Sequence, residues 1–531
     1  MKKLLCLLVA LTLVFALVGC ADFNSTVTDY SGNVSSNGGF AVVKGDYVYL
    51  INGYDLETAD NTFGKVVHGG IVRIKTADLG KDDIAAEMVV PKLVHTEYTG
   101  SGSGLFIAGD YVYYPTVNDQ KSSSGTVKYS EEVFMKTKLD ASESKIITTV
   151  SSHDVPYRFY EMAGRVFLTV YLTETDDDGN DVNYLVTYDE NGKEVKRSEK
   201  VVSYDLGEFG SDYAYYVRTA YNETLEQDES FNEVHRYSLD GSNDVMVLNG
   251  VGGYTDKVNG IGTQGVTFTI VKNAPSALFV AMTYVDTSVA SSTVYYALDH
   301  TGINTAGDAA GAKANYDAMT LLNDGDNNAS TIFAADAVYV AKNCIIYTDA
   351  NYGIVKYDYT ERNGLREGFT YIFQNKDIMG YTYEYKEGNY LYYSDSSSYY
   401  YRLDLSELVN MTTGETIEGS EPTVQRLTYC TTYTPGEWFN PEYVGDYMLY
   451  LRDGEPYDDY VYYVGLKDIE VRYEKSIVDI TDDEIEDYEE ELDTIEERAD
   501  IEAKLKKRVG ILSDVDKDAL ATYLDNNYPE D

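Results

Sequence analysis

Apolar and aromatic residues occur along this chain in short runs, and the same turn signal separates many pairs of runs. The phrase Gly-Asp-Tyr-Val-Tyr stands at 45–49 and returns with small changes at 109–114 and 445–450. Looser copies occupy 211–216 and 387–393. Glycine and aspartate favour a tight turn, whereas tyrosine and valine favour strands. The pattern therefore predicts a β-hairpin that is repeated along the chain.

The hairpin belongs to a longer unit of four strands. In the first unit we expect strands at 40–43, 47–51, 70–75 and 93–98, which form an up-and-down sheet. Similar units recur eight times between about residues 38 and 475, at an uneven spacing of roughly 45 to 65 residues. Four-stranded sheets at this period are typical of a β-propeller, in which neighbouring blades bury each other's faces.

The predicted fold class is therefore all-β, with a propeller of seven or eight four-stranded blades, eight being favoured. The run Tyr-Val-Tyr-Tyr at 111–114 lacks polar alternation, which indicates a central strand that is covered on both sides. A pair of β-sandwich domains is the alternative that the pattern leaves open.

The repeat resembles the Tyr-rich propellers of bacterial secreted proteins and lipoproteins, which carry a Gly-Asp-Tyr-Ile-Tyr-Tyr … Leu-Tyr-Arg-Ile-Asp phrase. These are similar in style to the extracellular propellers of low-density lipoprotein receptors. The best matches are 45–49, 109–114, 235–241 and 401–404. The receptor motif Tyr-Trp-Thr-Asp is absent, and 347–349 is only a partial echo of it. The resemblance implies the fold and carries over no binding residue.

The first residues have the organisation of a signal peptide. Lys2 and Lys3 precede an apolar segment at 4–18, which is short for a transmembrane helix. Leu-Val-Gly-Cys at 17–20 resembles a bacterial lipobox, which implies cleavage after residue 19 and lipid attachment to Cys20. An ordinary signal peptide is the alternative. The lipobox interpretation predicts an extracytoplasmic protein that is anchored to a bacterial membrane, with the cell surface as its expected location.

Charge and amino-acid composition indicate how the rest of the chain is organised. The formal net charge of −47 makes nucleic acid an unsuitable partner, and 53 Tyr against 16 Phe fit a strand-rich fold. The predicted organisation is a signal peptide at 1–19, a flexible tether at 20–38, a β-propeller at 39–475 and an acidic helical tail at 476–531. The amphipathic tail either rests on the propeller or binds a partner.

Candidate catalytic and metal-binding residues are few and are scattered along the sequence. The histidines, His68, His95, His153, His235 and His300, show no metal-ligand spacing, and we expect His235 to be packed in a strand. No catalytic motif is present, so catalytic residues stay unknown, although a carboxylate pair in a central funnel is open. Cys344 and Cys430 either form a disulfide or are two buried thiols.

One acidic segment is a calcium candidate. Asp176, Asp178, Asn180 and Asp181 surround a glycine, as ligands do in calcium loops, but no bidentate glutamate closes the segment. The same residues suit the tip of a hairpin, which is the alternative explanation. Calcium is the one cofactor that the sequence suggests.

The sequence favours a non-enzymatic function. We expect a membrane-anchored propeller lipoprotein that binds a protein, peptide or glycan through its unequal loops. The first alternative is an extracytoplasmic hydrolase or lyase with carboxylates in the propeller funnel. The second is an envelope assembly factor, by analogy of architecture alone.

Overall fold

The computed structural model describes residues between 34 and 465, with gaps. The longer gaps are 52–59, 80–85, 95–103, 119–130, 221–230, 256–261, 285–292, 323–337, 359–368, 374–381, 395–399, 418–423 and 427–441. The predicted signal peptide, Cys20 and the predicted acidic helical tail lie outside the described residues.

The strands of the described residues form antiparallel sheets that follow one another in chain order. The β2–β7 sheet, in the order β2-β3-β6-β7, consists of Ala41–Lys44, Tyr47–Ile51, Ile71–Lys75 and Glu87–Val90. The β8–β11 sheet consists of Phe106–Ala108, Tyr111–Val117, Glu132–Lys138 and Ser144–Val150, and β1 (Val34–Ser35) joins it beside β8. The β12–β15 sheet consists of Tyr157–Met162, Arg165–Thr175, Asp181–Asp189 and Glu194–Arg197. The β16–β19 sheet consists of Ser203–Asp205, Tyr213–Thr219, Asn232–Ser238 and Asp244–Asn249.

Further sheets follow in the second half of the chain. The β20–β24 sheet consists of Val251–Thr255, Gly262–Asn273, Ala277–Tyr284, Thr293–Asp299 and Thr320–Leu321. The β25–β28 sheet consists of Val338–Ala341, Cys344–Asp349, Gly353–Asp358 and Phe369–Phe373. The β29–β32 sheet consists of Thr382–Glu387, Tyr390–Ser394, Tyr400–Asp404 and Val424–Arg426, and the β33–β35 sheet of Glu442–Val444, Tyr447–Gly454 and Asp458–Gly465. A small ribbon pairs β4 (Asp60–Asn61) with β5 (Gly64–Lys65).

Helical elements are few among the described residues. They are the 3₁₀ turns η1 (Thr76–Asp78), η2 (His300–Gly302) and η4 (Leu405–Glu407) and the helix α2 (Ala309–Ala318). The Asp308 side chain caps α2 by accepting a hydrogen bond from the backbone N–H of Gly311. Asn315 of α2 donates to the Val247 carbonyl of β19 at 2.9 Å, so this insertion of the β20–β24 sheet packs on the preceding sheet.

The repeated phrase forms the predicted hairpin. Its glycine and aspartate make the turn between the first two strands, and the flanking residues pair across it, as Lys44 does with Tyr47 and Ala108 with Tyr111. Gly45 has a φ of 60° and Gly109 a φ of 57°, a conformation that glycine adopts without the steric cost of a Cβ. The phrase is therefore a turn signal in the structure as well as in the sequence.

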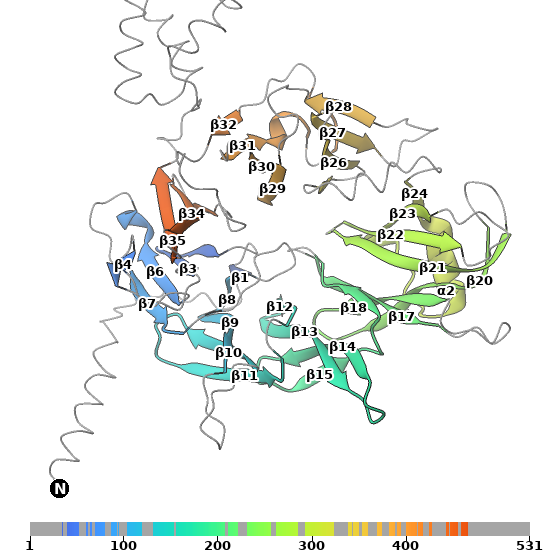
Figure 1. Cartoon of the computed structure of the whole chain (residues 1–531), viewed down its shortest axis with the longest axis horizontal. Helices are drawn as coiled ribbons and strands as arrows, with labels where there is room; N and C mark the ends of the chain where they lie inside the picture. The colour runs from blue at the N-terminus through green and yellow to red at the C-terminus, as the bar shows by residue number, and fades with distance from the viewer. Residues whose placement is uncertain are drawn as a thin grey trace, which may run out of the picture.

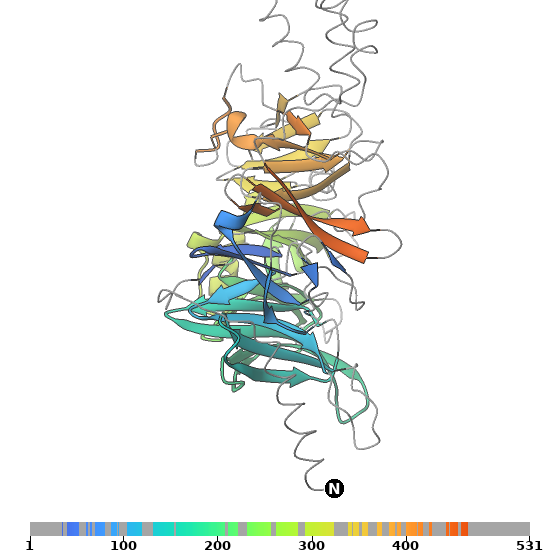
Figure 2. The same cartoon turned by 90° about the vertical axis from the view of Figure 1, so that its left-hand side faces the viewer.

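The sheets are arranged around a ring (Figure 1). Colour runs from the blue β2–β7 sheet through green and yellow to the orange β33–β35 sheet, which returns beside the blue one in both views (Figures 1 and 2). Apolar clusters fill the contacts between successive sheets, which we call seams. In the seam between the β8–β11 and β12–β15 sheets, the rings of Phe106 and Phe159 stack with centroids 5.7 Å apart.

Side-chain packing closes the ring between the first and last sheets. Strand β2 contacts β33, and the fully buried Leu449 of β34 belongs to the same apolar cluster as Phe40 and Val48. The protein is thus a β-propeller, rather than the pair of β-sandwiches that the sequence left open. The number of blades in the whole ring stays a prediction.

The fourth strand of the first unit differs from expectation. The fourth position of the sheet is held by β7, whose Val90 pairs with Ile71, and not by the predicted strand at 93–98, of which only Val94 lies among the described residues. Pro91 follows directly and has no N–H to continue the ladder. Val94 instead bridges to Thr116 of the next sheet, so the chain has already left the first sheet there.

Candidate functional site

The two ends of the ring carry different kinds of connection. In each up-and-down sheet the first-to-second and third-to-fourth connections lie at one end, which we call the turn side. The second-to-third connections and the links to the next sheet lie at the other end, the loop side. Where the structure describes them in full, the first-to-second connections are two-residue turns, at 45–46, 109–110 and 163–164. Second-to-third connections are unequal: 176–180, 220–231 and 52–70 differ several-fold in length.

Backbone hydrogen bonds tie the turn side together. The residue after the third strand donates its N–H to the carbonyl oxygen of the aspartate in the first turn: Leu139 to Asp110 at 2.9 Å, and Leu239 to Asp212 at 3.4 Å. Thr76 donates to Asp46 in the same way at 2.9 Å. The aspartates of the repeated phrase therefore serve the sheet through their backbone.

Carboxylates of the third-to-fourth turns are also used locally. Asp140 Oδ1 accepts from the backbone N–H of Ser142 at 2.9 Å, and Asp240 Oδ1 accepts from that of Ser242 at 2.9 Å. These are the aspartate turns that stabilise tight reversals. Longer connections hold η1, α2 and η4; α2 lies before the last strand of the five-stranded β20–β24 sheet.

The calcium candidate lies at the tip of the β13–β14 hairpin on the loop side. Asp176 Oδ1 accepts from the backbone N–H groups of Asp178 and Asn180, at 3.0 and 2.9 Å, and Gly179 has a φ of 84°. Asp181 accepts from the Thr175 hydroxyl at 3.4 Å. Across the residues that the structure describes, no three His, Cys, Asp or Glu side chains gather to hold a metal ion. Turn geometry accounts for Asp176 and Gly179, and the calcium site stays a prediction.

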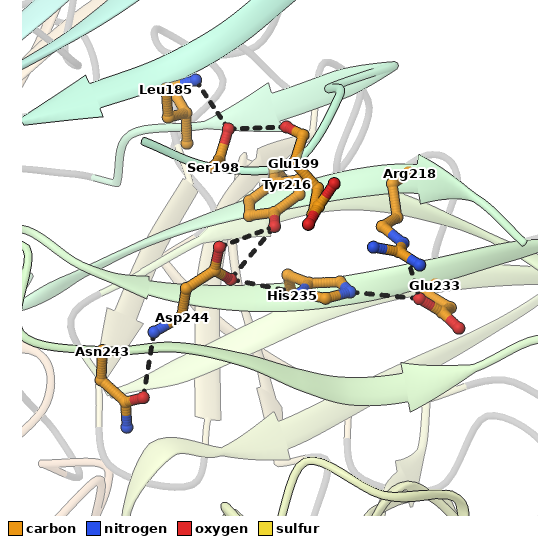
Figure 3. Close-up of polar contacts among 9 residues, drawn as sticks. All are labelled: Leu185, Ser198, Glu199, Tyr216, Arg218, Glu233, His235, Asn243 and Asp244. Atoms are coloured by element: carbon orange, nitrogen blue, oxygen red, sulfur yellow. Dashed lines mark hydrogen bonds and ion pairs between the residues drawn. The ribbon is translucent and has the colours of Figure 1, made fainter. Parts of the chain in front are cut away.

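A largely buried group of titratable side chains lies on the β16–β19 sheet (Figure 3). This His235 cluster consists of Tyr216 and Arg218 on β17, Glu233 and His235 on β18, and Asp244 on β19. Strand register sets Tyr216 opposite His235 and Arg218 opposite Glu233, so their side chains share one face of the sheet. That face belongs to the seam with the β12–β15 sheet, where Tyr216 packs with Leu185.

Two carboxylates flank the His235 imidazole. Its Nδ1 lies 3.2 Å from Asp244 Oδ1 and its Nε2 lies 3.2 Å from Glu233 Oε2. Burial alone lowers the pKa of His235, but hydrogen bonds to Asp244 and Glu233 outweigh it, so the pKa is raised. An ionised carboxylate can only accept, so contacts of both ring nitrogens with carboxylates favour an imidazolium that donates through both.

The remaining members complete the cluster. The Tyr216 hydroxyl donates to both oxygens of Asp244, at 3.1 and 2.9 Å, and its ring stacks on the imidazole with centroids 4.9 Å apart. Arg218 Nε lies 2.8 Å from Glu233 Oε2. Burial opposes ionisation of Glu233, but its bonds to His235 and Arg218 lower its pKa overall.

This arrangement suits a structural charge network better than a proton-transfer site. His235 is only 8% exposed, and both of its nitrogens already donate to carboxylates. It thus has no free nitrogen with which to accept a proton from a substrate. The expectation that His235 is packed in a strand is confirmed.

Sequence analysis missed the carboxylate partners. Glu233 and His235 stand two apart on one strand, which places them on one face and was readable from the sequence. The position of Asp244 beside His235 depends on the pairing of β18 with β19. The register of this pairing shifts between Val234 and His235 of β18, and no pattern in the sequence revealed the shift.

The two cysteines of the predicted propeller are placed unequally. Cys344 is fully buried on β26, and burial raises the pKa of its thiol to about 11, which makes it a poor nucleophile. Cys430 lies outside the described residues, so the pairing of the two stays a prediction.

Comparison with known proteins gave similarities only among solved structures. No protein-family model and no curated protein matches the chain. Among solved structures, it is similar to the β-propeller domain of the Trilobed protease from Pyrococcus furiosus, at 10% identity and a TM-score of 0.31, covering 73% of this chain and 94% of that domain. It is also similar to BamB from Moraxella catarrhalis, at 10% identity and a TM-score of 0.28, with 78% and 97% covered. A third is the polysaccharide lyase Uly1, at 9% identity and a TM-score of 0.30, with 77% and 94% covered.

Within the described part of the chain, no helix has the length and apolar character needed to cross a membrane.

Proposed function

We propose that this protein is an extracytoplasmic lipoprotein that is anchored through Cys20 and binds a protein, peptide or glycan at the loop side of its propeller. The observation that carries the proposal is the contrast between the first-to-second turns and the second-to-third connections. The first-to-second turns are short and held by repeated backbone bonds, whereas the loop side has connections of unequal length. Unequal loops on a rigid scaffold are where binding residues concentrate in proteins.

The described acidic and aromatic groups support binding rather than chemistry. Those of the His235 cluster bond to one another in a seam, Asp140 and Asp240 accept from backbone N–H groups, and Asp212 accepts from the Tyr160 hydroxyl. A formal charge of −47 also suits a well-solvated domain outside a membrane and disfavours nucleic acid as a partner.

The binding function is tested with the full chain on a glycan array and against a displayed random-peptide library. In one variant, residues 176–180 of the β13–β14 hairpin are replaced by Asn-Gly, a two-residue hairpin turn. The matched control on the turn side combines Asn191→Ala and Lys193→Ala, two exposed positions. We expect a hit whose binding falls at least about tenfold, roughly 1.4 kcal/mol, in the hairpin variant and is unchanged in the control.

Loss of binding only in the control variant would place the site on the turn side and contradict the proposed location. If neither the glycan array nor the peptide library yields a ligand, the binding function itself is contradicted. The anchor is tested separately with Cys20→Ala, expressed in bacteria. The wild-type chain is expected in the membrane fraction with the mass of its acyl chains, and the variant without them. An unmodified wild-type chain would refute the anchor and leave the binding result standing.

A further inference from the structure

We propose that two histidines on opposite faces of the β16–β19 sheet form a pH-sensitive device, with His235 charged and His300 neutral near pH 7. The seams on the two faces then weaken at opposite ends of the physiological pH range. The inference rests on hydrogen-bond partners and packing and is independent of the proposed binding function.

On the first face, His235 acts within its own sheet. Both of its nitrogens donate to carboxylates, one on β18 and one on β19, so the charged ring links two strands. Its stacking partner Tyr216 and the neighbouring Tyr237 reach the β12–β15 sheet. The Tyr237 hydroxyl bonds to Thr187 Oγ1 at 2.9 Å and donates to the Lys196 carbonyl at 3.1 Å. The position of β18 therefore determines how the β16–β19 sheet packs on the β12–β15 sheet.

On the second face, His300 links two sheets. It follows β23 of the β20–β24 sheet, and its ring stacks on Tyr215 of β17 with centroids 5.6 Å apart. Its Nε2 lies 2.8 Å from the Ala274 carbonyl oxygen, which only accepts, so Nε2 carries a hydrogen. Nδ1 lies 2.9 Å from the Tyr215 hydroxyl and accepts from it when the ring is neutral.

The charged groups around the two rings differ. Those facing the His235 cluster are Arg218, Glu233 and Asp244 on its own sheet, and Glu194, Lys196 and Glu199 from β15 and the residues after it (Figure 3). Those facing His300 are Arg236 and Asp212 of the β16–β19 sheet and Asp299 beside it. The nearest partners of His235 are thus carboxylates, whereas those of His300 are a carbonyl and a hydroxyl.

The two responses to pH have opposite signs. The pKa of His235 is raised, so its stabilisation is complete below the ordinary value of about 6.5 and is lost as pH rises through the folded-state pKa. Burial lowers the pKa of His300, and the Arg236 charge adds to this effect. Its stabilisation is complete above the ordinary value and is lost as pH falls through the folded-state pKa.

The test uses the full chain labelled with ¹⁵N-histidine and NMR detection of the ring nitrogens between about pH 5 and about pH 8. His235→Gln and His300→Gln assign the signals. At pH 7 we expect two protonated nitrogens for His235, and one protonated and one bare nitrogen for His300. Equal protonation states of the two rings at pH 7 would overturn the proposal.

Hydrogen exchange of the same samples measures the consequence at each seam. After correction for intrinsic rates, we expect exchange at β17 and β23 to accelerate as the pH falls below the ordinary histidine pKa, by at most about tenfold per pH unit, because one proton is taken up. This acceleration should vanish in His300→Gln and remain in His235→Gln. If the acceleration of exchange at low pH persists in His300→Gln, the proposed pH-sensitive role of His300 is contradicted. If a glutamine variant fails to fold, Tyr215→Phe is expected to alter only the acid response and Glu233→Gln only the alkaline one.

Discussion

At the residue scale, tyrosine serves this protein as an apolar side chain with a hydrogen-bonding tip. Tyr114, Tyr216 and Tyr237 are at most 1% exposed, yet each hydroxyl has a partner: Thr137, Asp244 and Thr187 respectively. Burial raises the pKa of all three hydroxyls, so they remain donors over the whole physiological range. A phenylalanine fills the same space but leaves the partner groups unsatisfied, which explains why tyrosine predominates.

The bond across one seam can be measured directly. Tyr237→Phe removes the hydroxyl that bonds to Thr187 and to the Lys196 carbonyl, so we expect a loss of about 1–2 kcal/mol in the free energy of unfolding. In a double-mutant cycle with Thr187→Val, we expect a coupling of about 0.5–1.5 kcal/mol. The measurement is urea unfolding at pH 7. Additive losses would show that the two hydroxyls do not interact.

At the element scale, the repeated turn depends on the backbone freedom of its glycine. Gly109 has a φ of 57°, so Gly109→Ala is expected to destabilise the fold by about 1–2 kcal/mol. Gly302→Ala is the control, because a Cβ there meets nothing within 4 Å and its φ is outside the left-handed region. The measurement is the denaturant midpoint of unfolding, which we expect to be lower for Gly109→Ala than for Gly302→Ala. Equal midpoints would mean that the turn tolerates a side chain.

The β13–β14 hairpin carries the calcium prediction. If the tip binds calcium, titration calorimetry should show heat with the wild-type chain and a much weaker response with Asp178→Ala, which removes one carboxylate. If the tip is only a turn, both traces are flat. Asp178→Ala is a mild change in either case, because the turn relies on Asp176 Oδ1 and on the Asp178 backbone.

Sequence reasoning reached the hairpins more securely than the edges of the sheets. The turn at 45–46 was predictable since glycine and aspartate mark it and both flanking strands are apolar. The fourth strand was misplaced: β7 is only four residues long and is followed by Pro91, so it leaves a weaker strand pattern in the sequence than 93–98. Asp244 joined His235 through a register shift, which tertiary pairing decides.

At the scale of the whole molecule, the protein has a series of seams in place of a single core. Apolar clusters join the β8–β11 sheet to the β12–β15 sheet, the latter to the β16–β19 sheet, and that one to the β20–β24 sheet. Each sheet contributes both faces, which is why its central strands lack polar alternation. Packing occupies the sheet faces, which agrees with the proposal that binding residues lie in the loops.

The closing seam provides a test of the ring. Leu449→Ala removes a fully buried side chain that packs with the first sheet, so we expect a loss of about 2–5 kcal/mol and faster hydrogen exchange in β2. Ile146→Ala, at a position that is 50% exposed, is the control and is expected to cost much less. Equal losses would mean that Leu449 does not contribute to closure.

The manner of closure also bears on how the chain folds. Apart from β1, each described sheet of three or more strands is built from one continuous stretch of chain, so most pairings have low contact order and can form in sequence. The contact between β2 and β33 requires both ends of the propeller, so we expect it to form late. A truncated chain therefore leaves the apolar face around Val48 and Leu50 uncovered. Such a surface marks unfinished molecules for aggregation or proteolysis, so the final seam acts as a checkpoint of completeness.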